Sequence, residues 1–332
     1  MTAATLRIWR ARQVLQLAVH QFFNDRQFLS IDTPILVTAP GTEVYLNYFD
    51  TTWVDHRLQE HTLYLRSSPE LHLKQALAMG ADRVYHLGKC FRNEGEYSRW
   101  HHPEFTMLEW YQTGIGYQDF MTQTEEFLRY TASALRPFQG ALSFEIPARI
   151  PRLTVAEAFE RFTGIPLQDQ DTDLATKGLA KGMKSLQPQD DFETAFFKLL
   201  LDYVEPGLAA MGCVFLMDYP ASQAALAKVE NGVARRFELY VNGVELCNAF
   251  QELTGAEANR QRIQEANLKR SLLGKPMVPD DDDFMAAMTQ GLPECCGNAL
   301  GFDRWLSLLT GASFDQTIPF RRGGCFQREI PS

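Results

Sequence analysis

Two neighbouring segments of the chain place a cation, carboxylates and aromatic rings in a pattern that could bind a charged ligand. Arg92 and Glu94 lie two residues apart near the end of one strand-like run, and Phe105, Glu109 and Tyr111 alternate along the next. Because every second residue of a strand faces the same side, these side chains would converge on one surface if the two strands pair. Ordinary cross-strand ion pairs on a solvated sheet face would give the same pattern, so this pattern alone does not assign a function.

The surrounding sequence predicts an antiparallel sheet flanked by helices, which is an α+β fold. Apolar residues at helical spacing over residues 6–23 predict an opening helix, and Ser67 with Glu70 predicts a capping box for a helix through residue 77. The Asn242-Gly243 pair suits a type I′ turn between two strands. The other predicted strands cover residues 28–34, 45–49, 63–66, 84–94, 105–111, 214–219, 237–241, the run from 244 and the run from 297, and the other predicted helices lie within 117–208, at 257–273, after the acidic run 280–283 and at the end of the segment 297–309.

Length and composition exclude several classes of protein. The chain has 332 residues, 45% of them hydrophobic, which predicts roughly two domains or one large α/β core with insertions and excludes a disordered or collagen-like chain. The net charge of −9, from 32 Lys and Arg against 41 Asp and Glu, is atypical of proteins that hold long nucleic acids. The six cysteines form no CxxC pair, which favours reduced thiols in the cytosol. Because no apolar run approaches the ~18 residues of a membrane span or the core of a signal peptide, we expect a cytoplasmic protein with no membrane partner.

Three blocks of polar and glycine residues follow one another along the chain, whereas the motifs GxxxxGKS/T, GxSxG and HExxH do not occur. The blocks are Arg92-Asn93-Glu94 with His102-Pro103-Glu104-Phe105-Thr106-Met107, then Glu245-Leu246-Cys247-Asn248-Ala249-Phe250-Gln251-Glu252-Leu253, then Gly297-Asn298-Ala299-Leu300-Gly301-Phe302-Asp303-Arg304. Together with Thr33-Pro34 they resemble the signature motifs of class II aminoacyl-tRNA synthetases, and within that class the lysyl branch. The resemblance covers nearly the whole chain and implies that family's catalytic core, an antiparallel β-sheet flanked by helices. It implies one catalytic domain over residues 1–332, with a helical insertion at about 117–208.

The resemblance also implies a site for ATP and Mg²⁺. Arg92 would grip the α-phosphate, for which a guanidinium fork is suited, Glu94 would read the adenine amino group, and Phe105 and Arg304 would enclose the adenine ring. Glu245 and Glu252 would hold Mg²⁺, which requires a bulge or twist because strict alternation puts them on opposite faces. The implied ATP-binding residues are Arg92, Asn93, Glu94, His102, Phe105, Glu245, Leu246, Gly301 and Arg304, and the catalytic ones among them are Arg92, Glu245 and Arg304.

An amino-acid pocket is implied in the same way. A carboxylate there would pair with the ammonium of lysine, and a phenol would add a directed hydrogen bond. Outside the family context, Glu70 would be a helix-capping residue and Tyr111 a core aromatic. The implied pocket residues are Ser68, Pro69, Glu70, Tyr111, Asn248, Glu252 and Ala299.

Two details resemble a family of synthetase paralogues that attach (R)-β-lysine to a lysine side chain of elongation factor P, a protein shaped like tRNA. One is the block that runs over residues 219–227, and the other is Ala299, where synthetases usually carry glycine. The opening helix begins by about residue 6, so we expect no N-terminal oligonucleotide-binding domain and no tRNA partner. The family implies an AMP-forming ligase with lysine or β-lysine and elongation factor P as partners. A truncated lysyl-tRNA synthetase and an inactive synthetase-like regulator are the alternatives.

Assembly is the last property that the resemblance implies. The opening helix and the strand that ends at Pro34 correspond to the first motif, which forms the two-fold interface in class II enzymes. We therefore predict a homodimer whose isologous interface buries Phe22, Phe23 and their neighbours. A helix that packs only on the core of its own chain is the alternative.

Overall fold

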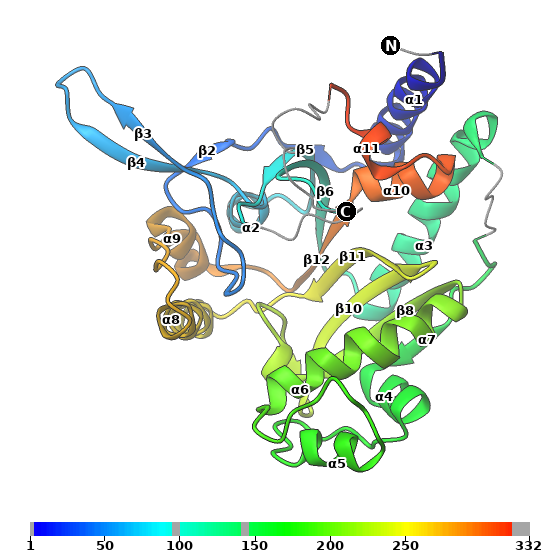
Figure 1. Ribbon diagram of the computed structural model, residues 1–332. Helices are drawn as coiled ribbons and strands as arrows, with labels where there is room; N and C mark the ends of the chain where they lie inside the picture. The colour runs from blue at the N-terminus through cyan, green and yellow to red at the C-terminus, as the bar shows by residue number, and fades with distance from the viewer. Residues whose placement is uncertain (1–2, 95–99, 141–145, 321–332) are drawn as a thin grey trace.

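A computed structural model describes residues 3–94, 100–140 and 146–320, and its centre is one large sheet (Figure 1). The strands follow the order β1-β5-β6-β12-β11-β10-β8-β7, with β9 paired to β10, and β2-β4-β3 form a second, small sheet. Only β1 with β5 and β7 with β8 run parallel among the described strand pairs. The strands are β1 (Leu29–Ser30), β2 (Leu36–Val37), β3 (Asp50–Val54), β4 (Glu60–Leu65), β5 (Arg83–Phe91), β6 (Glu104–Thr113), β7 (Arg152–Thr154), β8 (Cys213–Pro220), β9 (Val229–Glu230), β10 (Val233–Val241), β11 (Val244–Gln251) and β12 (Cys295–Gly301). The predicted α+β class with a mainly antiparallel sheet is confirmed.

Helices flank this sheet on both sides. They are α1 (Ala3–Asp25), α2 (Glu70–Ala78), α3 (Tyr117–Ala134), η1 (Arg136–Phe138), α4 (Val155–Thr163), α5 (Leu174–Ala180), α6 (Phe192–Leu199), η2 (Leu200–Val204), α7 (Glu205–Ala210), η3 (Ala221–Gln223), α8 (Ala256–Leu272), α9 (Asp282–Gly291), α10 (Phe302–Thr310) and α11 (Phe314–Thr317). None of the helices in the described ranges has the length and apolar character that a membrane crossing requires.

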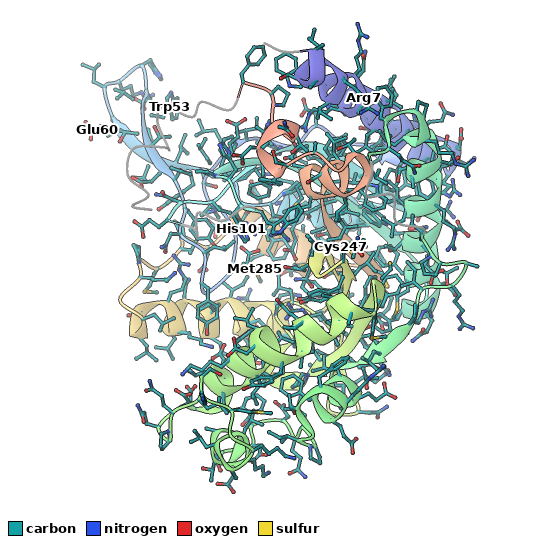
Figure 2. The ribbon with its side chains drawn as sticks, turned by 45° about the vertical axis from the view of Figure 1, so that its right-hand side comes forward. Arg7, Trp53, Glu60, His101, Cys247 and Met285 are labelled. Carbon is teal, nitrogen blue, oxygen red and sulfur yellow. The ribbon has the colours of Figure 1, made fainter. Side chains whose placement is uncertain are left out.

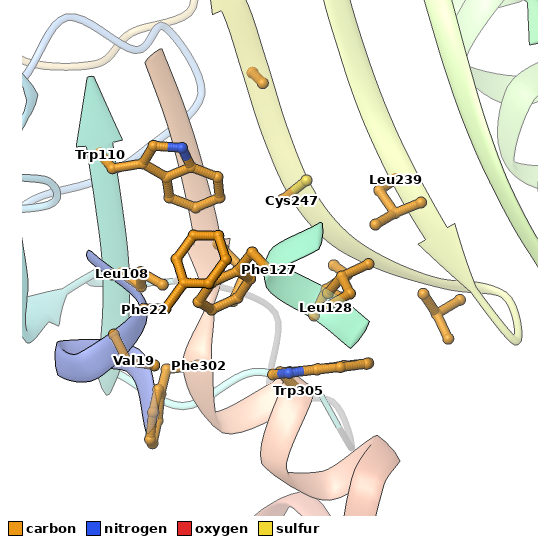
Figure 3. Packing of buried hydrophobic residues seen from close by; sticks show 14 of the residues in the cluster. Val19, Phe22, Leu108, Trp110, Phe127, Leu128, Leu239, Cys247, Phe302 and Trp305 are labelled. Carbon is orange, nitrogen blue, oxygen red and sulfur yellow. The ribbon is translucent and has the colours of Figure 1, made fainter. Parts of the chain in front are cut away.

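The two faces of the sheet bury different clusters. Along β8, Phe215 contributes to a cluster with α1, α3 and α10, whereas its neighbours Val214 and Leu216 contribute to a cluster with α4, α6 and α7. Figure 3 shows the first cluster, in which Phe22, Trp110, Phe127 and Trp305 pack together. A third cluster joins α2 and α9 to the other end of the second face. The middle of that second face therefore lies between α4–α7 on one side and α2 and α9 on the other.

Several predicted elements agree with the structure. The hairpin between β10 and β11 turns at Asn242 and Gly243, whose φ angles of 49° and 77° are those of a type I′ turn. The acidic run starts α9 as expected, because the side chain of Asp281 accepts a hydrogen bond from the backbone of Phe284. The five cysteines within the described residues are free thiols; Cys325 lies outside those residues.

Other local predictions were wrong. Residues 45–49 form no strand, because that segment makes only a single bridge, between Asn47 and Asn93. The strand predicted over residues 28–34 is reduced to β1. Ser67 does not cap α2, since its hydroxyl donates to the carbonyl of Pro40 and the helix starts after Pro69 without a side-chain cap.

The segment predicted as a helical insertion, residues 117–208, packs against both faces of the sheet. Helix α3 packs in the first cluster through Phe120 and Phe127, whereas the helices from α4 onward pack with β8 and β10 in the second. Phe22 and Phe23 are fully buried within this one chain, which corrects the prediction that a dimer interface buries them. Exposed apolar residues near the same elements are Leu6, Leu17, Leu29, Ile35 and Leu36.

Strands β3 and β4 form a hairpin that projects from the body of the molecule (Figure 1). Figure 2 shows Trp53 and Glu60 on this hairpin, and about half of the surface of Trp53 is exposed.

Candidate active site

One row of cross-strand neighbours runs across the middle of the second face of the sheet, between α4–α7 and α2 with α9. We call this part of the sheet the open face. Glu109 of β6 lies opposite Ala299 of β12, Ala299 lies opposite Asn248 of β11, and Asn248 lies opposite Glu238 of β10. Directly paired residues point to the same side of a sheet. Leu216, which belongs to the cluster under α4–α7, continues this row. The predicted site residues Asn248 and Ala299 therefore face the same side of the sheet as Glu109 and Glu238.

A bulge in β11 puts Glu245 and Glu252 on one face of the sheet. Leu239 pairs with Cys247, but the next residue of β10 pairs with Glu245, so Leu246 is an extra residue in β11. The predicted bulge is thus confirmed, and its physical effect is to reset the alternation of side chains. Leu246 itself is buried in the core on the opposite face, so its side chain cannot contact a nucleotide on the open face.

The same strand makes it impossible for Glu245 and Glu252 to share one metal ion. The bulge leaves about six regular strand steps of about 3.4 Å between them, which separates their Cα atoms by roughly 20 Å, whereas Mg²⁺ binds oxygen at about 2.1 Å. Instead, Oε2 of Glu252 lies 2.7 Å from Nζ of Lys74. The prediction that both glutamates are magnesium ligands is therefore corrected. The described residues contain no group of three or more His, Cys, Asp or Glu arranged to hold a metal ion by themselves.

Buried carboxylates gather at the α2 end of the row. Oε1 of Glu109 accepts a hydrogen bond from Ser68 at 2.6 Å, and its Oε2 accepts one from the hydroxyl of Tyr111 at 3.2 Å. Lys74 donates to Oε1 of Glu70 at 2.5 Å and also contacts Glu252. The predicted pocket residues Ser68, Glu70, Tyr111 and Glu252 are thus brought together, and Pro69 serves as the residue at which α2 begins.

Burial raises the pKa of two carboxyl groups in this pocket and of one beside it. Burial, with the charge of Glu70 as the next cause, raises the pKa of Glu109 to about 8. Burial also raises the pKa of Glu252 to about 7, although Lys74 opposes the shift. Glu43 lies near Glu70 and Arg92, and burial raises the pKa of its carboxyl as well. Burial is the main cause of these shifts and the charge of Glu70 adds to them, so an ammonium group placed beside these carboxyl groups would favour their ionised form.

Gly297 of β12 leaves the space between two of these groups. A Cβ atom at Gly297 would lie 2.1 Å from a ring carbon of Tyr111 and 2.5 Å from Oε1 of Glu252. Both of those residues are buried, and so neither can move aside easily. The absence of a side chain at this position is therefore a requirement of the pocket.

Guanidinium groups and an aromatic ring lie at the other end of the face. The guanidinium of Arg92 lies 5.1 Å from the centre of the Phe105 ring. Arg304 donates to the backbone oxygen of Glu245 at 2.6 Å, and its guanidinium lies 3.0 Å from Nε2 of His101. Figure 2 places His101 near the middle of the molecule. Gly301 leaves room for the side chain of Arg304, because a Cβ there would lie 3.2 Å from Cδ of Arg304.

A buried network fixes the start of α10, and with it Arg304. The carboxylate of Asp303 pairs with Arg12 of α1 and also accepts a hydrogen bond from the backbone of Thr106 at 2.6 Å. Arg12 donates in turn to the hydroxyl of Thr106 at 2.6 Å. The network thus joins α1, β6 and α10 directly behind the residues predicted to enclose adenine.

The other predicted nucleotide residues lie in turns. Strand β5 ends at Phe91, so Arg92 and Glu94 do not share a strand face as predicted. Glu94 is exposed, has a φ of 48° and accepts a hydrogen bond from Asn47 at 2.8 Å. Asn93 holds the same turn through its bridge to Asn47. Nδ1 of His102 lies 2.6 Å from the carbonyl oxygen of Glu104, which is a contact within its own turn.

The structure adds polar residues that the sequence analysis did not select. Glu238 accepts hydrogen bonds from Arg236 at 2.6 Å and from Tyr240 at 2.9 Å. Burial, followed by the charge of Glu238, raises the pKa of Glu245. The alternation of Arg236, Glu238 and Tyr240 along one predicted strand was the signal that could have found Glu238. The four-residue spacing of Glu70 and Lys74 was the corresponding signal for Lys74.

Comparison with known proteins assigns the family. The family described as tRNA synthetases class II (D, K and N) matches residues 2–322. A protein named elongation factor P–(R)-β-lysine ligase from Vibrio parahaemolyticus is 35% identical over 324 residues, which cover 96% of each chain. Proteins of the same name from Hamiltonella defensa and Proteus mirabilis are each 36% identical, and the matches cover 89% and 88% of this chain and 88% of each relative. With its motifs on one sheet face and this similarity along its length, the chain belongs to the class II (D, K and N) tRNA synthetase family, together with the elongation factor P–(R)-β-lysine ligases.

Proposed function

We propose that this protein is an ATP-dependent ligase that activates (R)-β-lysine as an aminoacyl-adenylate and transfers it to a lysine side chain of elongation factor P. The observation that carries the proposal is the cluster of carboxylates from the buried Glu109 and Glu252 and the half-buried Glu70, which lies on the same sheet face as the guanidinium end of the site. A substrate with two ammonium groups and one carboxylate fits such a cluster. The names of the relatives supply the identity of the amino acid and of the acceptor protein.

Activation requires alignment of two anions rather than a protein nucleophile. The carboxylate of the amino acid attacks the α-phosphorus of ATP, and pyrophosphate leaves. Arg92 and Arg304 provide fixed positive charge for this step, in which positioning and preorganised electrostatics carry the catalysis. Phe105 offers an apolar ring on which adenine can stack, beside the guanidinium of Arg92. The amine of the acceptor lysine then attacks the mixed anhydride, and AMP leaves.

Glu238 and Glu245 are the residues that would hold Mg²⁺. They are neighbouring carboxylates on the open face, and the charge of Glu238 helps to raise the pKa of Glu245. Mg²⁺ is usually bound by one or two carboxylates together with substrate phosphates, so this pair fits the ion. When bound, Mg²⁺ would neutralise charge on the phosphates of ATP. The protein contributes Arg236 and Tyr240, which hold the carboxylate of Glu238 in place.

A direct test is mass spectrometry of purified elongation factor P after incubation with this enzyme, ATP and either (R)-β-lysine or α-lysine. The proposal expects a mass increase of one lysyl group on elongation factor P, larger with (R)-β-lysine. A parallel arm with tRNA in place of elongation factor P tests the lysyl-tRNA synthetase alternative. Pyrophosphate exchange with each isomer tests the inactive regulator, because failure of both isomers would contradict both enzyme functions.

We also propose that the protein forms a homodimer and acts in the cytoplasm. The exposed apolar residues Leu17, Leu29 and Leu36 lie on α1, β1 and β2, the region in which the family resemblance places the two-fold interface. Light scattering should give the mass of two chains at micromolar concentration, and Leu17→Asp with Leu29→Asp should reduce it to one. A mass of one chain for the wild type would refute the dimer.

A further inference from the structure

Lys74 is a fully buried lysine whose ammonium lies inside the amino-acid pocket. Its Nζ lies 2.5 Å from Oε1 of Glu70 and 2.7 Å from Oε2 of Glu252, and none of its surface is exposed. Burial alone would lower the pKa of Lys74, but the charges of Glu252 and Glu70 raise it above its ordinary value. Lys74 is therefore a permanent cation of the pocket.

The two oxygens of Glu252 have different surroundings. Both oxygens are buried and lack a hydrogen bond of regular geometry among the described residues, but Oε2 lies 2.7 Å from Nζ of Lys74 as an ion pair, whereas no such ion pair is formed by Oε1 within those residues. Oε1 faces the space that Gly297 leaves open beside Tyr111. A buried carboxylate oxygen without a partner is costly, and a ligand ammonium at this position would satisfy it. Lys74 thus fixes one side of Glu252 and leaves the other side for the substrate.

The charges of the pocket can be counted. Glu70, Glu109 and Glu252 contribute three carboxyl groups and Lys74 contributes one ammonium, so the pocket carries two negative charges once all four groups are ionised. Burial raises the pKa of Glu109 to about 8 and that of Glu252 to about 7 in the ligand-free protein, and the ammonium groups of a bound ligand would favour the fully ionised state. We propose that Lys74 is a specificity-determining residue, a built-in ammonium that adjusts the charge of the pocket to the two ammonium groups of a diamino acid. This inference rests on the proposed function for the identity of the substrate, but the charge match itself can be tested with simple amines.

Removal of Lys74 should couple ligand binding to protons. The groups that face its ammonium are Glu70 on α2, Glu252 after β11 and Cys295 on β12, with Glu109 and Tyr111 on β6 close to the two glutamates. Without the lysine, Glu70 and Glu252 would take up a proton that an entering ammonium has to displace. The pKa of Glu252 is already about 7, and each unit by which a carboxyl pKa rises above 7 weakens apparent binding at pH 7 by about tenfold. A purely structural role would instead reduce thermal stability and leave ligand preference unchanged.

The first experiment measures pyrophosphate exchange in Lys74→Met, in Lys74→Ala and in the control Lys198→Met. Lys198 of α6 forms its ion pair with Asp190, which precedes that helix, and not with a carboxylate of the pocket. In both Lys74 variants we expect the KM for (R)-β-lysine at pH 7 to rise ~10-fold or more and to fall again towards pH 9, with the KM for ATP unchanged. Ethylamine, which can occupy the space left in Lys74→Ala, should lower that KM again but should have no effect on Lys198→Met. An unchanged KM, or equal increases for ATP and amino acid, would overturn the inference.

The second experiment separates this inference from the proposed function, and its first arm uses only the wild type. Calorimetry of the wild type with 1,5-diaminopentane and with 1-aminopentane should show tighter binding of the diamine. Equal affinities for the two amines would overturn the inference even if the enzyme lysylates elongation factor P. If exchange fails with both lysine isomers but the diamine still binds more tightly to the wild type than to Lys74→Met, the proposed function fails and the role of Lys74 stands.

Discussion

Ala299→Gly should relax the choice between α-lysine and (R)-β-lysine. The methyl group of Ala299 projects from β12 between Glu109 and Asn248, on the face that carries the pocket, and the residue is partly exposed there. Ala299 lies within the β12 ladder, two residues before the end of that strand at Gly301, so it does not simply pack the turn before α10. Its methyl group is therefore in a position to limit where an ammonium can lie.

The size of the effect follows from one methyl group. Transfer of a single methylene corresponds to ~0.8 kcal/mol, which is about fourfold in rate, and shape discrimination by one such group reaches about 10–200-fold at most. We expect kcat/KM for α-lysine to increase within that range. The value for (R)-β-lysine should change little, because Glu70, Glu109 and Glu252 are unaltered. Loss of backbone restriction should lower stability by ~0.5–1 kcal/mol.

The assay is pyrophosphate exchange with each isomer, read as the ratio of the two kcat/KM values. Ala249→Gly is a matched control, because Ala249 lies in the adjacent strand β11 but points into the hydrophobic cluster on the other face of the sheet. Both variants should lose stability in thermal unfolding, and only Ala299→Gly should shift the ratio. If Ala299→Gly lowers both values together and leaves the ratio unchanged, Ala299 has no part in the selection of the isomer.

Three further outcomes follow from the same geometry. Gly297→Ala places a Cβ 2.5 Å from Oε1 of Glu252. We therefore expect kcat/KM for either lysine isomer to fall by about 10²-fold, with the KM for ATP unchanged. Normal activity of this variant would contradict the packing argument. Burial raises the pKa of Glu109 to about 8, so ionisation of Glu109 lowers the stability of the ligand-free protein as pH rises from 4.5 through 8. Glu109→Gln should therefore raise the melting temperature at pH 8.5 relative to the wild type but not at pH 4, and it should abolish amino-acid activation; equal melting shifts at both pH values would contradict the assignment. Glu245→Gln and Glu238→Gln should each increase the Mg²⁺ concentration that gives half-maximal exchange, and a change in only the lysine KM would exclude them as ligands of the ion.

The local sequence determines much of this fold because many of its signals act over only a few residues. Asn242 and Gly243 can both adopt positive φ, which is why the β10–β11 hairpin is readable without a structure. Asp281 likewise caps the start of α9 by accepting a hydrogen bond from the backbone of Phe284, only three positions further along the chain. The order of the motifs, and with it the family, is also a property of the chain alone.

Local signals failed where a segment had a choice of partners. Residues 45–49 have the composition of a strand, but the neighbouring segment β3 pairs with β4 instead. Ser67 has the side chain of a helix cap, yet its hydroxyl bonds to Pro40, which is distant in sequence. Phe22 and Phe23 have the apolar character of an interface, but the core of the same chain covers them.

The amino-acid pocket depends on tertiary structure throughout. The bulge at Leu246, which puts Glu245 and Glu252 on one face, arises from the register between β10 and β11, and periodicity along one strand carries no information about register. Lys74 is a pocket cation only because α2 packs against the end of the sheet and brings it to Glu252. A buried charge is tolerated only where the fold supplies its partner. The sequence therefore determines which residues of this protein are charged, and the tertiary packing determines which of them form ion pairs.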